Sequence, residues 1–191
     1  MNKAVFLDRD GTINVEKNYL HKINEFEFCP GAIEGMKLLQ EAGFKLIIIT
    51  NQSGIGRGYY TEEAFLLLNK WMIDRLQREG VIIDKVYYCP HLPNAAIEKY
   101  RKMCNCRKPL LGLYEKAIKE FNLRVDSCYA IGDKIRDCKI CEVTDCKGFL
   151  ISNNEKKIID VVITGKYKNI RVANDLLDAA KKIIVCEGCS L

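Results

Sequence analysis

Short apolar runs alternate with amphipathic segments along the chain, and this alternation predicts an α/β fold. The runs at 3–7 and 45–49 are almost entirely apolar, as strands buried in a parallel sheet are. Pro30 opens a segment with apolar residues at helical spacing, and Gly43 ends it. Thr61 is the expected N-cap of a second helix that extends to about residue 80. The first half of the chain therefore predicts two strands and two helices.

The second half repeats the pattern. We expect further strands at 84–88, 127–131 and 148–151, with another at 161–163. We expect further helices at 110–121, 135–144 and 173–184. Strands and helices in this alternation predict a parallel sheet with helices on both faces and a ligand site beyond the carboxyl ends of the strands. Residues 1–191 are expected to form a single domain, with an irregular insert at about 89–109.

Composition and charge narrow the class of protein. The 191 residues are 48% hydrophobic and 29% charged, which is typical of one soluble domain. The longest apolar runs fall far short of the roughly 18 residues of a membrane span. Charged residues directly follow the first short apolar run, so we expect no secretory signal and a cytoplasmic location. The net charge of +5 is spread along the chain, which suits an anionic substrate better than a nucleic-acid arm.

Polar side chains follow the predicted strands at one edge of the sheet. Asp8 and Asp10 follow the first strand, Thr50 the second and Asp133 a later one, while Lys108 lies at the end of the insert. Converging carboxylates favour a hard divalent cation, here Mg²⁺. One carboxylate can then attack a phosphorus while the second exchanges protons with the leaving group and with water. The hydroxyl and the ammonium can stabilise the phosphoryl oxygens.

The insert contains a second set of candidate ligands. They are three cysteines and a histidine in two closely spaced pairs: Cys89, His91, Cys104 and Cys106. This set predicts a closed tetrahedral Zn²⁺ site with a structural role. Because Cys106 is covalently joined to Arg107, the metal is expected to fix Arg107 and Lys108 near the phosphate.

Seven of the ten cysteines stay outside this site. We interpret them as small core or tail residues, because thiols in a reducing compartment rarely form disulfides. A second zinc site that joins Cys138 and Cys141 to Cys186 and Cys189 is a less favoured alternative.

The residues that follow the strands resemble a known superfamily. The segment 8–12 (Asp-Arg-Asp-Gly-Thr), Thr50, Lys108 and Gly132–Asp133 with Asp137 resemble the four motifs of haloacid dehalogenase (HAD) phosphatases, over about residues 3–151. The resemblance implies a HAD-type, Rossmann-like sheet. It implies that Asp8 is the nucleophile and Asp10 the general acid/base. It also implies that Asp8, the Asp10 backbone carbonyl and Asp133 bind Mg²⁺.

The insert narrows the resemblance further. Its Cys-Pro-His and Cys-x-Cys-Arg-Lys-Pro runs are similar to the zinc loop of the heptose bisphosphate phosphatases and of the related histidinol-phosphate phosphatases. This implies a short zinc-bound loop and no large cap domain. It also implies a set of substrate contacts: Glu16, Lys17, Asn18, Tyr19, Asn51, Gln52, Ser53, Arg107 and Lys134.

Together these features predict a Mg²⁺-dependent phosphatase that removes the C7 phosphate of D-glycero-D-manno-heptose 1,7-bisphosphate through an aspartyl-phosphate. Adjacent Arg107 and Lys108 motivate a substrate with two phosphates. A histidinol-phosphate phosphatase stays open as an alternative, as does a zinc-stabilised binding module without catalysis. We expect a monomer that acts on a small phosphorylated sugar and binds neither nucleic acid nor membrane. The anomer and the pathway, lipopolysaccharide or surface-layer glycan, stay open.

Overall fold

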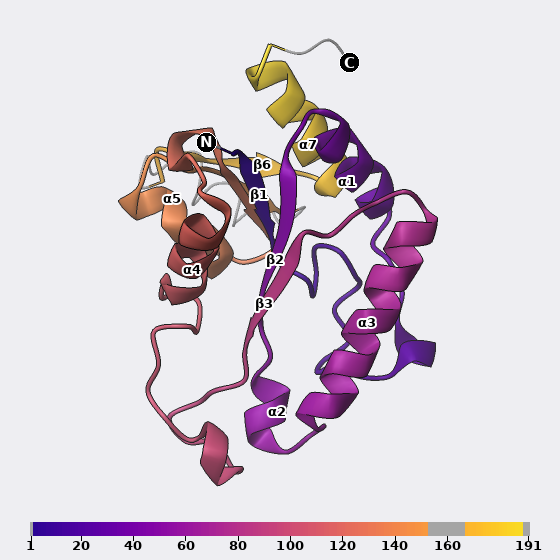
Figure 1. Ribbon diagram of the computed structural model, residues 1–191, viewed down its shortest axis with the longest axis vertical. Coiled ribbons are helices and arrows are strands. Elements are labelled where there is room, and N and C mark those ends of the chain that lie inside the picture. Colours follow the sequence, from indigo (N-terminus) through magenta and orange to yellow (C-terminus); the bar gives the residue numbers. More distant parts are fainter. Residues whose placement is uncertain (1, 153–166, 189–191) are drawn as a thin grey trace.

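The computed structural model describes residues 2–152 and 167–188, and these form a six-stranded parallel sheet between helices (Figure 1). The strands are β1 (Ala4–Leu7), β2 (Lys45–Asn51), β3 (Lys85–Cys89), β4 (Tyr129–Gly132), β5 (Lys147–Ile151) and β6 (Ile170–Ala173). Their order is β3-β2-β1-β4-β5-β6. The order reverses between β1 and β4, and such a switch point is where doubly wound sheets bind their ligands.

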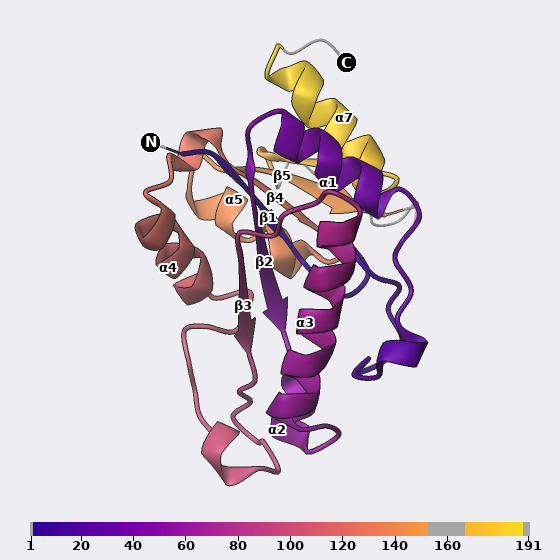
Figure 2. The same ribbon diagram turned by 45° about the vertical axis from the view of Figure 1, so that its right-hand side comes forward.

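Helices cover both faces of the sheet, as predicted (Figures 1 and 2). One face carries α1 (Ala32–Glu41), α3 (Glu62–Arg78) and α7 (Leu176–Cys186). The other carries α4 (Gly112–Phe121) and α5 (Ile140–Val143). The short helix α2 (Ser53–Arg57) directly follows β2. The 3₁₀ helices are η1 (Ile23–Glu25), η2 (Glu98–Tyr100), η3 (Val125–Ser127) and η4 (Ile135–Cys138).

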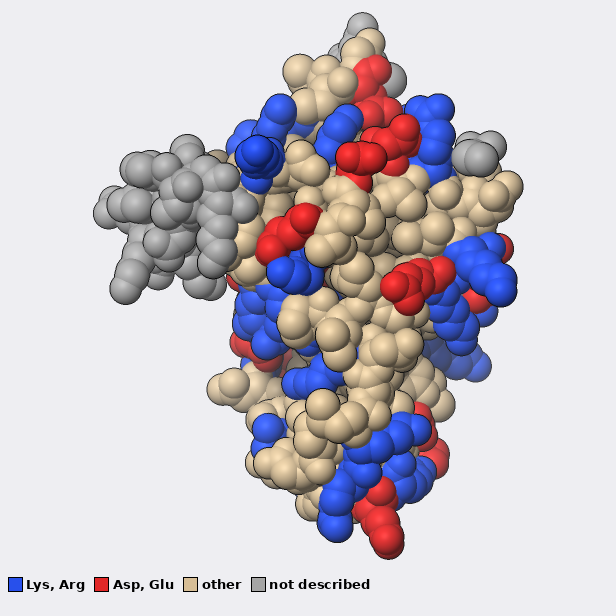
Figure 3. Space-filling model, turned by 90° about the vertical axis from the view of Figure 1, so that its left-hand side faces the viewer, with Lys and Arg blue, Asp and Glu red and all other residues tan. Residues whose placement is uncertain are grey.

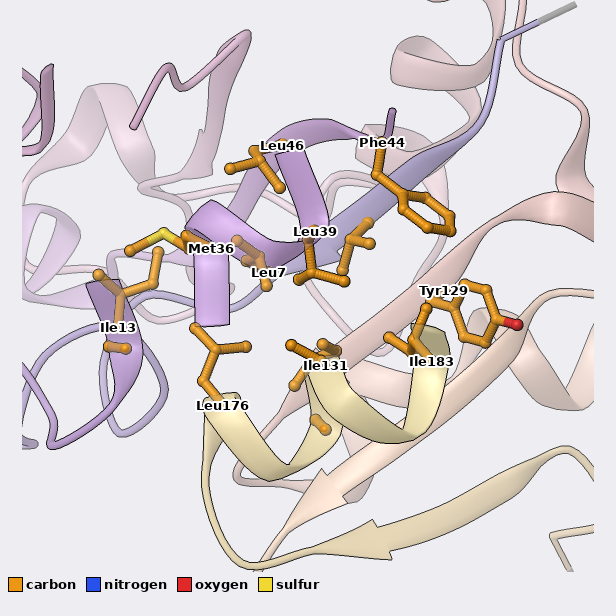
Figure 4. Packing of buried hydrophobic residues seen from close by; sticks show 14 of the residues in the cluster. Leu7, Ile13, Met36, Leu39, Phe44, Leu46, Tyr129, Ile131, Leu176 and Ile183 are labelled. Carbon is orange, nitrogen blue, oxygen red and sulfur yellow. The ribbon is translucent and has the colours of Figure 1, made fainter. Parts of the chain in front are cut away.

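Alternating side chains of each strand enter two separate cores. In β1, Val5 and Leu7 pack on one face, whereas Ala4 and Phe6 pack on the other. Because both faces are covered, the strand is apolar at every position, which is the pattern read from the sequence. Figure 4 shows how Leu7 and other strand residues meet side chains of α1 and α7.

Polar side chains cap two of the helices, and the first of these caps was expected from the sequence. The Thr61 hydroxyl accepts a 3.1 Å hydrogen bond from the Ala64 backbone N–H at the start of α3. Asp175 likewise caps α7 through a 2.7 Å hydrogen bond from the Asp178 N–H. These caps fix where the two helices begin relative to the sheet.

Two expectations for the elements differ from the structure, and a third falls outside the described residues. The helix predicted at 135–144 is instead η4 followed by α5, because Asp137 turns back to accept a hydrogen bond from the Lys134 N–H. The predicted start of the last helix at 173 is wrong, since Ala173 ends β6 and the helix begins after the Asp175 cap. The strand predicted at 161–163 lies outside the described residues.

Most of the unassigned cysteines lie in the core. Cys128, Cys138, Cys141 and Cys146 are buried in the apolar cluster beneath α4 and α5, as expected of small core residues. Cys29 is half-buried and Cys186 is exposed. The alternative second zinc site requires Cys189, which lies outside the described residues.

The surface gives two further observations. On the face over α4 and α5, Lys and Arg are interspersed with Asp and Glu among large neutral areas (Figure 3). The described side chains of this face therefore make no continuous basic stripe of the kind that binds nucleic acid. Among the described residues, no helix is both long and apolar enough to cross a membrane.

Candidate active site

The carboxyl ends of β1, β2 and β4 open into a polar cavity of about 290 Å³. Parallel pairing aligns Leu7 with Ile131, and the Asp8 backbone N–H donates a 2.9 Å hydrogen bond to the Ile131 carbonyl. Most of the predicted site residues line this cavity: Asp8, Asp10, Glu16, Asn18, Tyr19, Thr50, Asn51, Gln52, Ser53, Arg107, Lys108 and Lys134. Sequence positions up to 126 residues apart thus meet at one site, because parallel strands end at the same edge.

A buried ion-pair network lies at the base of the cavity. The Lys108 ammonium lies 2.6 Å from an Asp8 carboxylate oxygen and 2.7 Å from one of Asp137. It also donates a 2.6 Å hydrogen bond to the Ile49 carbonyl. Burial alone would lower the pKa of Lys108, but the two carboxylates raise it above its usual value. Lys108 therefore stays a cation at the point where a phosphoryl group would meet Asp8.

Asp8 experiences opposing influences. Burial raises its pKa most, the Asp137 carboxylate raises it further, and Lys108 lowers it, with a net rise to about 7. An added cation beside Asp8 would favour the ionised, nucleophilic form.

Three carboxylates are placed where a cation can bind. Asp8, Asp133 and Asp137 each offer an oxygen, and these oxygens lie within 4.8 Å of one another. Burial raises the pKa of Asp133, so the site disfavours uncompensated negative charge. Gly11 permits the close approach, because a Cβ there would lie 2.7 Å from the Asp133 carboxylate. An all-oxygen, acidic donor set of this kind fits Mg²⁺.

The Asp10 carboxylate points to a different set of partners. One oxygen accepts hydrogen bonds from Arg9 Nη2 at 2.9 Å and from Asn14 Nδ2 at 3.1 Å. The other accepts a 2.9 Å hydrogen bond from Gln52 Nε2. Burial alone would raise the pKa of Asp10, but the Arg9 charge and these hydrogen bonds lower it below its usual value. The metal ligand predicted from Asp10 is its backbone carbonyl, and that assignment stays a prediction.

Two residues predicted as substrate contacts, Gln52 and Asn51, form hydrogen bonds with other groups of the protein. Gln52 is only 2% exposed, and its amide also donates a 2.9 Å hydrogen bond to the Thr50 hydroxyl. The Asn51 side chain accepts a hydrogen bond from the Lys108 N–H at 3.0 Å and donates one to the Lys108 carbonyl at 3.1 Å. Asn51 therefore holds the backbone of Lys108 at two points.

The rim of the cavity carries both signs of charge. Lys134 forms ion pairs of 3.4 Å with Glu16 and with Asp133. Arg107 contributes a buried Nη1 that has no hydrogen-bond partner among the described residues, which suits an anionic ligand. Lys17 does not line the cavity, and its ammonium instead contacts Glu27 and the Glu25 carbonyl at 3.0 and 2.9 Å.

Sequence reasoning did not select five residues that line the cavity: Arg9, Leu20, Arg57, Tyr60 and Arg136. Arg9 lies between Asp8 and Asp10 in the sequence, and Arg136 directly precedes Asp137. This proximity to motif carboxylates could have indicated both arginines. Arg57 ends α2, a five-residue helix too short to give a periodic pattern. Tyr60 lines the cavity and its hydroxyl donates to Gln52, a contact that no sequence pattern indicates.

The insert brings its four predicted ligands together. The Cys89 sulfur lies 3.3 Å from the Cys106 sulfur and 3.6 Å from the Cys104 sulfur. His91 Nδ1 lies 3.2 Å from the Cys106 sulfur and 3.8 Å from the Cys89 sulfur. Tetrahedral Zn²⁺ with ordinary bond lengths requires separations of about 3.8 Å between sulfurs and about 3.5 Å between sulfur and nitrogen. The cluster therefore fits a zinc ion.

This cluster is joined to the cavity at both ends of the insert. Cys89 is the last residue of β3, pairs with Asn51, and accepts a 2.8 Å hydrogen bond from the Gln52 N–H on its carbonyl. Cys106 directly precedes Arg107 and Lys108. The cluster of cysteines and histidine therefore adjoins both segments that carry the cavity's hydrogen-bonding side chains.

Comparison with known proteins gives the family. The sequence profile of the Polynucleotide kinase 3 phosphatase family matches residues 3–157. The chain is 41% identical to the D-glycero-β-D-manno-heptose-1,7-bisphosphate 7-phosphatase of Haemophilus ducreyi, over 92% of this chain and 95% of that protein. The chain belongs to the heptose-1,7-bisphosphate 7-phosphatase family of the HAD superfamily.

Further relatives agree with this family. The protein of the same name from Pasteurella multocida is 39% identical over 96% of this chain and 97% of its own. The crystal structure of D,D-heptose 1,7-bisphosphate phosphatase from B. bronchiseptica, complexed with magnesium and phosphate, superposes with a TM-score of 0.80. It is 26% identical and covers 97% of this chain and 99% of that one. The HAD fold expected from the motifs is thereby confirmed.

Proposed function

We propose that this protein is a Mg²⁺-dependent phosphatase that removes the C7 phosphate of D-glycero-D-manno-heptose 1,7-bisphosphate. The observation that carries the proposal is the setting of Asp8: it faces a polar cavity, beside Asp133 and 2.6 Å from the Lys108 ammonium. The sugar is proposed from the names of the relatives, which act on heptose 1,7-bisphosphate. Because those names specify the β-anomer, we propose the β-anomer as the preferred substrate.

The side chains support a two-step reaction through the protein's own carboxylate. An Asp8 oxygen forms a bond to the phosphorus, and the bond from phosphorus to the C7 oxygen breaks. The alkoxide takes a proton from Asp10, which must be in its acid form in the substrate complex even though Arg9 lowers its pKa in the free protein. A water then attacks the aspartyl-phosphate and gives a proton to Asp10, which releases phosphate and restores Asp8. Thr50 and Lys108 stabilise the phosphoryl oxygens through both steps.

Asp8, Asp133 and the Asp10 backbone carbonyl would hold the Mg²⁺. The bound ion would neutralise the carboxylates and polarise the phosphoryl group. The relative from B. bronchiseptica, crystallised with magnesium and phosphate, supports this assignment.

The remaining phosphate of the substrate would meet the basic rim. Arg107 supplies a buried donor without a partner among the described residues, and Lys134 lines the same cavity. Glu16, Asn18, Tyr19 and Ser53 are proposed contacts for the sugar hydroxyls. Zn²⁺ would be structural, and residues 1–191 would act as one domain and as a monomer, because one chain supplies the cavity lining.

Substrate and nucleophile are tested together by phosphate release. The wild type is assayed with both anomers of heptose 1,7-bisphosphate and with histidinol phosphate, each with Mg²⁺, beside Asp8→Asn. We expect the highest kcat/KM for the β-anomer and a loss of about a thousandfold or more in Asp8→Asn, which cannot form the phosphoenzyme. A higher kcat/KM for histidinol phosphate would reverse the substrate assignment. No hydrolysis of any of the three by a folded wild type would favour a binding module.

A further inference from the structure

Arg9 is a buried cation that pairs with the carboxylate of the neighbouring Asp10. The residue is 1% exposed, and its guanidinium lies 5.4 Å from the centroid of the Phe65 ring. Its Nε lies 3.2 Å from both oxygens of Asp10, while its Nη2 lies 2.9 Å from one of them and 3.3 Å from the Leu20 carbonyl. A buried charge is costly unless it is paired with good geometry, so this contact is specific to Asp10. A lysine ammonium cannot reproduce such a forked contact.

The other partners of Asp10 complete a cage around the carboxylate. Asn14 donates to the same oxygen as Arg9 Nη2, and Gln52 Nε2 donates to the other. The Tyr60 hydroxyl donates a 2.6 Å hydrogen bond to Gln52 Oε1, which fixes the amide with its N–H groups toward Asp10. The carboxylates of Asp8 and Asp10 also repel each other. The carboxylate therefore cannot rotate without losing several hydrogen bonds.

The cage treats the two carboxylate oxygens differently. Arg9 Nε lies 3.2 Å from both oxygens, and beyond this shared contact Oδ1 accepts from two further nitrogens, Arg9 Nη2 and Asn14 Nδ2, whereas Oδ2 accepts from one, Gln52 Nε2. Oδ2 therefore retains more capacity to carry a proton. A proton donor must lie within hydrogen-bond distance of its acceptor, so the orientation of this oxygen decides how well a leaving alkoxide is protonated.

We propose that Arg9 is a positioning residue, which orients the Asp10 carboxylate so that Oδ2 protonates the leaving oxygen. The Tyr60–Gln52 pair supports the same orientation from the opposite side. The inference rests on the proposed phosphatase function and adds a residue that acts through Asp10. It predicts that loss of the forked contact lowers kcat/KM strongly for substrates whose leaving group needs a proton and little for substrates whose leaving group does not.

Two aryl phosphates of similar size separate this role from a general loss of structure. Phenyl phosphate releases a basic phenolate, whereas 4-nitrophenyl phosphate releases a stable anion that needs little protonation. For each variant we take the ratio of kcat/KM for 4-nitrophenyl phosphate to that for phenyl phosphate. In Arg9→Lys, which keeps the charge, the ratio should rise about tenfold above wild type, because general-acid catalysis contributes about a hundredfold or more. A loss of folded enzyme or of Mg²⁺ affinity lowers both values and leaves the ratio unchanged.

Arg136→Lys is the matched control, since Arg136 lines the same cavity and no hydrogen bond or ion pair joins it to Asp10 among the described residues. Its ratio should stay within twofold of wild type. Asp10→Asn should raise the ratio most, and adding Arg9→Lys to it should give no further rise. A wild-type ratio in Arg9→Lys, or equal rises in both arginine variants, would overturn the inference.

Tyr60→Phe keeps the inference testable if Arg9→Lys does not fold. It removes one hydroxyl that holds the Gln52 amide and leaves the ring stacked on His21. The ratio should rise severalfold, and an unchanged ratio in a folded Tyr60→Phe would overturn the inference. A wild type that hydrolyses neither aryl phosphate nor any sugar phosphate would instead refute the proposed function.

Discussion

At the scale of single residues, Asp8 is a buried carboxylate whose pKa is raised in the absence of a bound cation. Burial and the Asp137 carboxylate raise its pKa, and Lys108 only partly offsets them. In the proposed mechanism the Asp8 carboxylate must be ionised both to bind Mg²⁺ and to attack phosphorus. The raised pKa of the neighbouring Asp133 acts in the same direction.

Mg²⁺ affinity should therefore depend on pH in a definite sense. With a pKa of about 7, Asp8 is mostly protonated at pH 6 and mostly ionised at pH 8. Since protons compete with the cation, we expect the Kd for Mg²⁺ to be about tenfold larger at pH 6 than at pH 8. Calorimetry should also record proton release on binding at pH 6.5. A Kd that is the same at both pH values would contradict this account of Asp8.

The site residues that could be predicted from sequence are those whose position follows from the strand that precedes or contains them. Asp8 and Asp10 come just after β1 and Thr50 is the next-to-last residue of β2, and their position at the sheet edge follows from parallel pairing. The pairing of Lys108 with Asp137 and the contact of Gln52 with Tyr60 depend on how loops fold back over the sheet. No spacing in the sequence specifies these contacts, so they became evident only in three dimensions.

At the scale of elements, the insert is a separate structural unit fastened to the active site. Its apolar side chains, including Leu92, Ala95 and Tyr100, pack with Phe65 at the start of α3. Glu62 accepts hydrogen bonds from the Tyr88 and Tyr100 hydroxyls at 2.8 and 2.7 Å. This small cluster does not include the Arg107–Lys108 end of the insert, where Asn51 and the proposed zinc ion hold the backbone and Asp8 and Asp137 hold the Lys108 ammonium.

Removal of one zinc ligand should thus affect stability and catalysis together. We expect Cys106→Ser to lose zinc, to melt at a lower temperature and to have a kcat reduced by about tenfold or more, as loss of support around a metal site typically does. Metal analysis, thermal unfolding and steady-state kinetics measure the three effects. Cys186→Ser, at an exposed cysteine on α7, should change none of them. Full activity in a verified zinc-free protein would refute the link between the insert and catalysis.

The long periodic helices were predictable, whereas two short elements, α2 and β6, were not. The helices α1 and α3 began within two residues of their predicted starts, because Pro30–Gly31 and Thr61 mark those starts. The five-residue α2 and the four-residue β6 carry too few positions to show a period. The break between η4 and α5 depends on where the Asp137 side chain turns, which propensity does not encode.

At the scale of the whole molecule, the helices that pack most closely together on the sheet are not the segments that line the active-site cavity. The pair α1 and α7 packs closely on one face of the sheet, at Gly35, and the residues that line the cavity lie on other segments (Figure 1). A Cβ at Gly35 would lie 2.8 Å from the Leu176 carbonyl oxygen, which is backbone and cannot easily move. Stability and activity should therefore respond to different substitutions.

Gly35→Ala tests this separation. Alanine would favour the helix by about 1 kcal/mol, but overpacking against α7 costs about 1–3 kcal/mol, so we expect a net loss of stability. Chemical denaturation should show a lower free energy of unfolding, while kcat and KM below the melting transition stay within twofold of wild type. Glu34→Ala, on the exposed side of α1, is the matched control and should unfold like wild type. A stabilised Gly35→Ala protein would show that α7 moves aside freely.

The most direct test of the central proposal is to follow the fate of each phosphate by ³¹P NMR. Purified protein with Mg²⁺ is incubated with D-glycero-β-D-manno-heptose 1,7-bisphosphate. We predict that the C7 phosphate signal is replaced by inorganic phosphate while the C1 phosphate persists, and that Asp8→Asn leaves both signals unchanged. Loss of the C1 phosphate, or retention of both by the folded wild-type protein, would contradict the proposed function.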